Sequence, residues 1–117
     1  MIGVRGLVFA GTATDRRHET VLFVERTLGL PRIDAPGVDA DLFELPDGST
    51  FAVASPRSMG ETSRSIGFLV NDVDEALAVL AAGGVEPEGE VASNGRRRYV
   101  HVRFPDGNLY ELIDERV

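Results

Sequence analysis

The chain contains the same short segment twice. Pro46-Asp47-Gly48 recurs as Pro105-Asp106-Gly107, 59 positions further along a chain of 117 residues. An apolar residue precedes each copy, and strand-forming residues follow it. A repeat at about half the chain length predicts two copies of one supersecondary unit, so the fold must bring two similar halves together.

Each half has the same predicted order of elements. In the first half we expect a strand at 2–10, a helix from about 18 to 28, a short strand between Pro31 and Pro36, and a hairpin of 39–45 and 49–54. In the second half we expect a strand at 64–70, a helix, a short strand near 88–92, and a hairpin of 97–104 and 108–114. Each half is therefore a βαβββ module.

Local signals mark the ends of these elements. Asp72 is a helix N-cap residue with Glu75 as its capping-box partner, and Gly83-Gly84 ends that helix. In both hairpins proline presets φ and glycine accepts a positive φ, which favours a turn. The polar segment 55–63 is the expected linker, so the first module spans about 1–55 and the second about 64–117 of a single domain.

Composition excludes several classes of protein. The chain has no cysteine, which excludes disulfides, thiolate metal sites and cysteine nucleophiles. Its formal net charge of -7 disfavours nucleic-acid binding, and it suits a cationic ligand or plain solubility equally well. No apolar run approaches the roughly 20 residues that cross a bilayer, and no secretory signal is visible, so we expect a cytoplasmic protein. The basic run 96–98 is either a solvated segment or an anion clamp.

The alternation of strand residues predicts which side chains line a cleft between the modules. We place Phe104 opposite Leu109 in the second hairpin and Leu45 opposite Thr50 in the first. The cleft wall then holds Asp41, Phe43, Ala52, Ser65, Arg98, Val102, Phe104 and Glu111, with Gly6 on the first strand. His101 points to the opposite face, away from Glu111. A register shift of one residue would invert these assignments.

Three segments resemble the vicinal oxygen chelate superfamily, also called the glyoxalase/bleomycin resistance protein/dioxygenase family. The sequence FVERTLGL at 23–30 resembles the end of the family's first helix. The sequence SIGFLVNDVDEA at 65–76 resembles the start of its second module, and FPDGNLYEL at 104–112 resembles its closing hairpin. The resemblance implies an α+β fold in which two βαβββ modules form a curved mixed sheet around a cleft.

The resemblance also implies where a metal would bind. Metal-dependent members carry ligands, usually His or Glu, on the first and last strands of each module. These positions match Gly6, Ala52, Ser65 and Glu111 here, so one ligand of four is kept. A catalytic metal needs about three protein ligands, and glycine and alanine offer none. We therefore expect no metal cofactor, with a divalent metal as the alternative.

Glu111 is the central candidate residue. A carboxylate on an apolar strand face is costly unless it is paired, so we expect a partner such as Arg98, a bound cation or water. Asp41 lies on the same predicted wall, and two acids beside Phe43 and Phe104 suit an amphipathic cation. For Asp41, an exposed position at a strand end is an equal alternative.

Three hypotheses of function follow. The sequence favours a metal-free small-molecule binding protein, with a cationic or aromatic ligand, similar to the bleomycin resistance proteins. The alternative is a metal-dependent enzyme of the glyoxalase or dioxygenase type, with Glu111 as the catalytic base or a retained ligand. The third is an interaction module without a small ligand. The resemblance further implies a homodimer.

Overall fold

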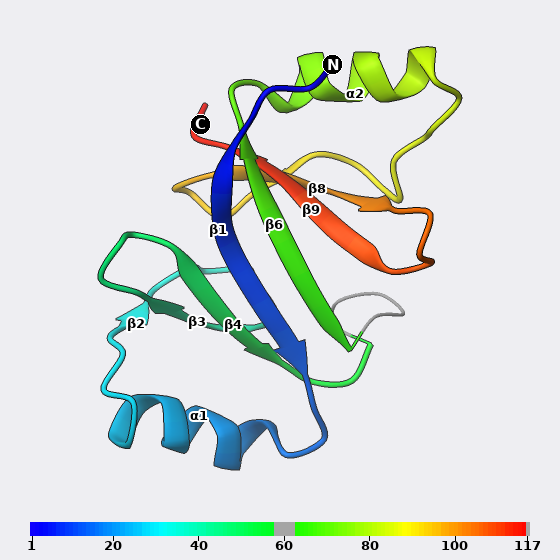
Figure 1. Cartoon of the computed structure of the whole chain (residues 1–117). Helices are drawn as coiled ribbons and strands as arrows, with labels where there is room; N and C mark the ends of the chain where they lie inside the picture. Colours follow the sequence, from blue (N-terminus) through cyan, green and yellow to red (C-terminus); the bar gives the residue numbers. More distant parts are fainter. Residues whose placement is uncertain (58–62, 117) are drawn as a thin grey trace.

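The computed structural model describes residues 1–57 and 63–116. Within these residues eight strands form one sheet in the order β2-β3-β4-β1-β6-β9-β8-β7. Figure 1 shows the sheet curling between two helices at opposite ends of the molecule. The expected α+β architecture of two βαβββ modules is confirmed.

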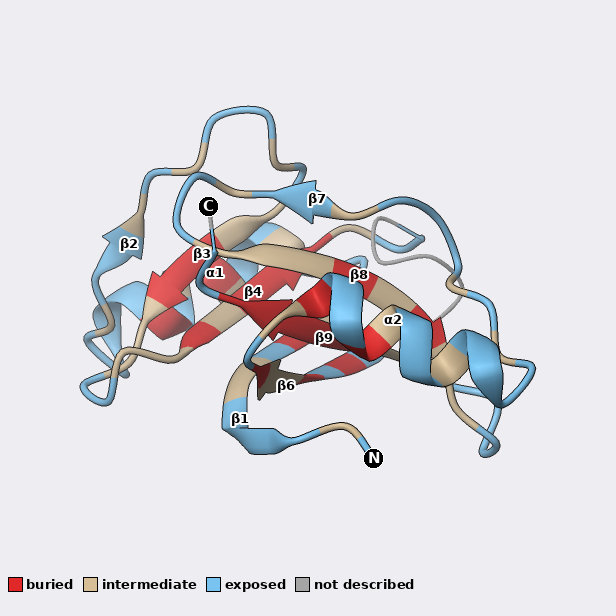
Figure 2. Ribbon diagram, turned by 90° about the horizontal axis from the view of Figure 1, so that it is seen from above, coloured by how far each residue is buried: buried red, intermediate tan, exposed pale blue. Residues whose placement is uncertain are grey.

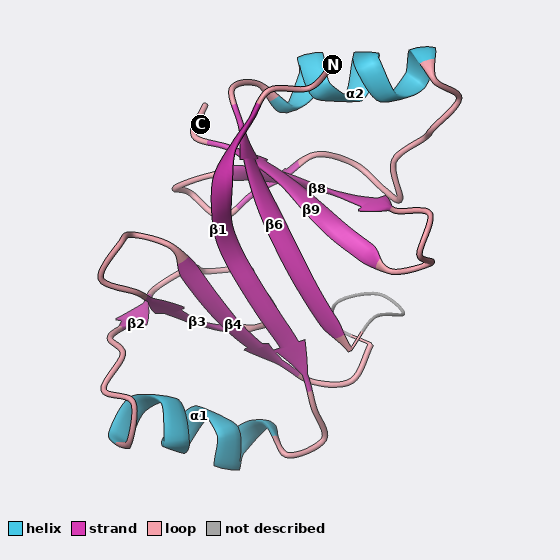
Figure 3. Cartoon of the chain, in the orientation of Figure 1, coloured by secondary structure: helices cyan, strands magenta, loops and turns pink. Residues whose placement is uncertain are grey.

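The first module contains one helix and four strands, which Figure 3 distinguishes by colour. They are β1 (Val4–Ala13), α1 (Arg17–Arg26), β2 (Arg32–Ile33), β3 (Asp41–Glu44) and β4 (Thr50–Ala54). Val21 and Val24 of α1 pack against Phe43 and Val53, which form the core of this module. Leu28, at the expected end of this helix, is exposed because the helix ends at Arg26.

The second module repeats this order. It comprises β6 (Arg64–Val70), α2 (Val73–Ala82), β7 (Ala92–Ser93), β8 (Arg98–Arg103) and β9 (Leu109–Asp114). The Asp72 side chain accepts hydrogen bonds from the backbone N–H groups of Asp74 and Glu75, as the capping signal predicts. Most of the expected linker, 58–62, lies outside the described residues.

The two modules pair through their first strands. β1 runs antiparallel to β6, whereas β1 with β4 and β6 with β9 are parallel pairs. The cleft between the modules is therefore formed within one chain.

Figure 2 shows the buried residues concentrated in the sheet. In the part of the chain that is described, no helix is long and apolar enough to span a membrane.

Candidate functional site

A row of paired residues crosses five neighbouring strands at the middle of the sheet. Thr50 pairs with Phe9, Phe9 with Gly67, Gly67 with Glu111, and Glu111 with His101. A methyl group added at Gly67 would lie 2.8 Å from Phe9 Cβ and 3.5 Å from Glu111 Cβ. The side chains of Phe9 and Glu111 therefore flank Gly67 on the same face of the sheet, and that face is the one away from the helices.

This face contains a cavity of about 170 Å³. Its apolar lining comes from both modules and includes Val8, Phe9, Val38, Leu42, Ala52 and Ile113. Its polar lining includes Asp39, Thr50, Asn94, Arg97, Tyr99, His101 and Glu111. A mostly apolar hollow with a few converging polar groups is the usual form of a small-molecule site.

Glu111 is the buried acid of this cavity. The residue is 6% exposed, and its Oε2 lies 3.5 Å from Nε2 of His101 on the neighbouring strand. That separation allows an ion pair when His101 is protonated, but it is too long for a strong hydrogen bond. The carboxylate is therefore only partly compensated by its protein neighbours, and it remains available to a ligand.

Tyr99 stands beside this pair on β8. Its ring meets the His101 ring edge to face at 6.0 Å. Burial raises the pKa of the Tyr99 phenol, and the negative charge of Glu111 raises that pKa further. The phenol stays protonated at neutral pH, so it can donate a hydrogen bond to a ligand in the cavity.

The hairpin turns fix a register that differs by one residue from the predicted one. Leu45 N–H donates to the carbonyl of Ser49, and Phe104 N–H donates to the carbonyl of Asn108. Each loop is therefore the three residues Pro-Asp-Gly, with φ of 84° at Gly48 and 85° at Gly107. The prediction that Leu45 lies opposite Thr50, and Phe104 opposite Leu109, is wrong because it made each loop one residue too long.

This shift inverts the strand before each turn and leaves the strand after it unchanged. Ala52 and Glu111 line the cavity as predicted. Five expected cleft residues instead lie on the helix face, where they do not line the cavity: Asp41, Phe43, Arg98, Val102 and Phe104. The residues that take their place are Leu42, Tyr99 and His101, so the prediction that His101 points away from Glu111 is also wrong.

The displaced residues of the first module have structural contacts. Phe43 is fully buried against Val21 and Val24 of α1. Asp41 accepts hydrogen bonds from Arg17 and Arg32. Although burial raises the pKa of the Asp41 carboxyl, the bonds from these two arginines outweigh it and hold the pKa below its usual range. Asp41 is thus an acid already neutralised by the protein.

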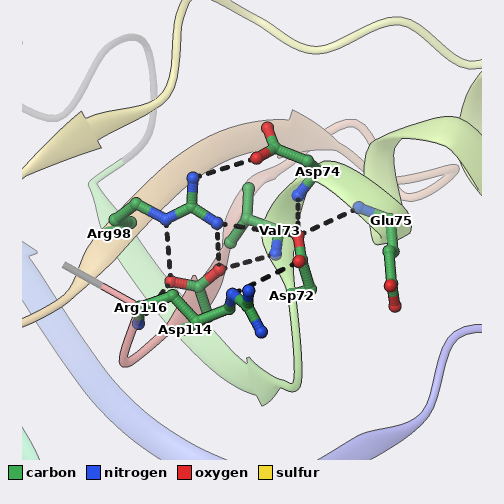
Figure 4. A network of polar contacts seen from close by, with 7 residues as sticks. All are labelled: Asp72, Val73, Asp74, Glu75, Arg98, Asp114 and Arg116. Atoms are coloured by element: carbon green, nitrogen blue, oxygen red, sulfur yellow. Dashed lines mark hydrogen bonds and ion pairs between the residues drawn. The ribbon is translucent and has the colours of Figure 1, made fainter.

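The displaced residues of the second module lie in the core or in a polar network. Val102 packs in the buried cluster under α2, and Phe104 stacks on Tyr110 with ring centres 4.0 Å apart. Figure 4 shows Arg98 facing three aspartates, among them the fully buried Asp114. Arg98 donates to Asp114 from Nε at 3.0 Å and from Nη2 at 2.6 Å. Arg98 therefore joins β8 to β9 and to the start of α2, and it is not the partner of Glu111.

The structure also corrects the expected equivalence of the first strands. Gly11 pairs with Ala52 on β4, and Gly67 pairs with Glu111 on β9. Because the repeat matches Ala52 with Glu111, Gly11 corresponds to Gly67, and Phe9 therefore corresponds to Ser65. Gly6 pairs instead with Leu69. The first strands are therefore offset by 56 positions and not by 59, because Gly67 and Glu111 are 44 positions apart whereas Gly11 and Ala52 are 41 apart.

The four positions implied for a metal are thus Phe9, Ala52, Ser65 and Glu111. Ser65 is buried, and its hydroxyl donates to the Leu109 carbonyl at 3.4 Å, outside the cavity lining. His101 adds one possible donor beside Glu111. The described residues contain no group of three or more His, Cys, Asp or Glu side chains able to hold a metal ion. This donor set does not fit the family's metal, which needs about three protein ligands.

Comparison with solved structures identifies the fold. A glyoxalase/bleomycin resistance protein/dioxygenase superfamily member from Vibrio splendidus 12B01 matches with a TM-score of 0.64, 17% identity, and coverage of 97% of this chain and 99% of that one. The methylmalonyl-CoA epimerase from Mycobacterium tuberculosis matches with a TM-score of 0.67 and 18% identity, over 100% and 94% of the two chains. The Mn(II)-bound glyoxalase from Novosphingobium aromaticivorans matches with a TM-score of 0.75 and 14% identity, over 96% of this chain and 38% of that one.

These identities show the fold and not the activity. No family model matches the sequence, and no curated protein matches it. The resemblance found in the sequence is confirmed at the level of the fold.

Proposed function

We propose that this chain, which has the glyoxalase/bleomycin resistance-like fold, is a binding protein for a small organic cation and works without a bound metal. The observation that supports this proposal is the buried carboxylate of Glu111, which faces the cavity and lies 3.5 Å from Nε2 of His101. Burying a carboxylate is costly, and a ligand ammonium group would offset that cost with a charge-assisted hydrogen bond. The role resembles that of the bleomycin resistance proteins.

The size of the cavity limits the ligand. An engineered cavity of about 150 Å³ holds one benzene molecule, and the present cavity measures about 170 Å³. One ring with a short basic arm therefore fits inside, next to the apolar side chains of Val8, Phe9 and Ile113. A larger natural product would bury only a ring-sized part of itself here.

A calorimetric titration with benzylamine and its neutral analogue benzyl alcohol tests the proposal. We expect benzylamine to bind at least 10-fold more tightly, since a hydrogen bond to a charged group contributes about 1.5–3 kcal/mol. Glu111→Gln should abolish the difference. Glu25→Gln is the matched control, because Glu25 lies on α1 and pairs with Arg32 away from the cavity. Equal affinity of parent and Glu111→Gln for benzylamine would contradict the proposal.

The alternative is a metal-dependent enzyme of the glyoxalase or dioxygenase type. The contact between His101 and Glu111 favours it, since the two side chains supply two metal donors or a base with an adjacent acid. Further donors would have to come from outside the described residues. Metal analysis of protein purified without chelator, followed by titration with Zn, Ni, Fe, Mn and Co, decides between the two. About one tightly held equivalent would refute the metal-free proposal.

We further propose that the protein is a homodimer that uses the outer face of its two central strands. Leu7 of β1 is 60% exposed, and Val4 and Ile66 are also exposed on this pair of strands. Figure 1 shows the two helices at opposite ends of the molecule, away from the middle of β1 and β6. Exposed apolar groups gathered on one surface are typical of an interface. Light scattering should give a dimer mass for the parent and a monomer mass for Leu7→Asp, and a monomeric parent would refute this interface.

A further inference from the structure

Arg97 supplies a positive charge to the same cavity. It precedes β8, and its side chain is only 17% exposed. Its guanidinium donates to the carbonyl of Gly48 at 3.2 Å and to that of Val8 at 3.5 Å. Its acidic partner is Glu115, which lies 3.8 Å away and is largely exposed. Arg97 is thus a mostly buried cation that is held by neutral carbonyl groups and retains donors for an anion.

Arg97 and Glu111 bring opposite charges to the lining of one cavity. The Val8 carbonyl, which accepts a hydrogen bond from Arg97, is next to Phe9 on β1. Phe9 pairs with Gly67 on β6, and Gly67 pairs with Glu111 on β9. Strands lie about 4.8 Å apart, so two spacings separate β1 from β9 by roughly 10 Å. Arg97 pairs with Glu115 rather than with Glu111. The two charges therefore do not neutralise each other.

The space between these charges is apolar and aromatic. Arg97, Tyr99 and His101 are two residues apart along the chain, so Tyr99 lies between the other two on the same face of the sheet. Tyr99 pairs with Ile113 on β9. Both side chains line the cavity, as do Val8 and Phe9 on the other wall. A ring in this space would have the acid of Glu111 on one side and the guanidinium of Arg97 on the other.

We propose that the ligand is amphoteric, with a basic nitrogen bound by Glu111, a ring between Tyr99 and Phe9, and a carboxylate bound by Arg97. The two charged groups of the ligand stand roughly 10 Å apart, which is the width of the two strand spacings between β1 and β9. A guanidinium suits a carboxylate because its planar donors match two oxygens at once. This inference rests on the proposed function, and it adds to the amine site an anion site on the opposite wall.

Three probes separate the two sites. 4-(2-Aminoethyl)benzoate carries both charges, phenethylamine carries only the amine, and 4-ethylbenzoate carries only the carboxylate. We expect calorimetry to show that the first probe binds at least 10-fold more tightly than either of the others. Arg97→Gln should reduce its affinity to that of phenethylamine and leave the affinity for phenethylamine unchanged.

A neighbouring arginine provides the control. Arg96 pairs with Glu44 on the surface, so Arg96→Gln should change the affinity for all three probes less than twofold. Arg97→Lys keeps the charge and loses the two-pronged geometry, and it should weaken binding of the doubly charged probe alone by about 3- to 10-fold. It serves as the test if Arg97→Gln does not fold.

The outcomes distinguish this inference from the proposed function. If 4-(2-aminoethyl)benzoate binds no more tightly than phenethylamine, or if neither Arg97 variant weakens it, the anion site is refuted and the amine site stands. If none of the three probes binds, both proposals are refuted. Selective loss of the doubly charged probe in the Arg97 variants supports the amphoteric ligand.

Discussion

Asn in place of Asp114 should destabilise the protein severely. The Asp114 carboxylate is fully buried and accepts hydrogen bonds from Arg98, from the Val73 N–H at 2.7 Å and from the Arg116 N–H at 3.0 Å (Figure 4). In Asp114→Asn, one acceptor oxygen becomes an NH₂ group that faces donors. Removing one partner from a buried ion pair costs about 3–5 kcal/mol. For a chain of this size that corresponds to a fall in Tm of roughly 10–20 °C.

A matched variant isolates the effect of burial. Asp74 also pairs with Arg98, at 3.0 Å, but its side chain is 68% exposed. Asp74→Asn should therefore cost less than about 1 kcal/mol, as exposed ion pairs generally do. Urea unfolding followed by circular dichroism measures both variants. If Asp114→Asn lost no more stability than Asp74→Asn, the argument from burial would be refuted.

The same carboxylate gives the stability a pH dependence. Burial alone would raise the pKa of Asp114, but hydrogen bonds from Arg98 and from two backbone N–H groups outweigh it and lower the pKa below its ordinary value. Because the folded state has the lower pKa, the stabilisation is complete above the unfolded value of about 3.9 and is lost as the pH falls through the folded value. The parent should lose stability below about pH 4 more steeply than Asp114→Asn does.

Two further predictions concern the cavity. Gly67→Ala should cost about 1–3 kcal/mol of stability in urea unfolding, because the new methyl group would lie 2.4 Å from Ile113 Cδ1 and would overpack the floor of the cavity; an unchanged midpoint would show that this floor is loosely packed. In a spectrophotometric titration, one tyrosine, Tyr99, should ionise at lower pH in Glu111→Gln than in the parent, though still above its ordinary value, because burial is the larger cause of its raised pKa and remains; an identical titration curve would contradict the placement of Glu111 beside it.

The order of elements was predictable from the sequence because each carries a local signal. Asp72 caps α2, the apolar spacing defines both helices, and the repeated Pro-Asp-Gly defines both hairpins. These signals act within a few residues, so a single sequence reveals them. The resemblance of the two halves then predicted a curved sheet of two modules, and the structure has it.

The candidate site was predictable only in part, because it depends on register. Glu111 and Ala52 lie on the strands that follow the turns, and they were predicted on the correct face of the sheet. Asp41 and Arg98 lie on the strands that precede the turns, and they were predicted on the wrong face because each loop was taken as one residue too long. The signal that decides the loop length was present, since glycine as the third residue after the strand favours a three-residue loop. The register of each first strand against the last strand of its module has no such local signal, so the match of Phe9 with Ser65 required the structure.

Methyl NMR of the cavity during a titration with phenethylamine tests directly whether Glu111 binds a cation there. The methyl signals of Val8, Leu42 and Ile113 should shift with one binding curve. Those of Val21 and Val24, on α1, should stay in place, and in Glu111→Gln the shifts should require at least 10-fold more phenethylamine. Shifts that persist unchanged in Glu111→Gln, or that appear under α1 instead of in the cavity, would contradict the central claim that Glu111 binds a cation there.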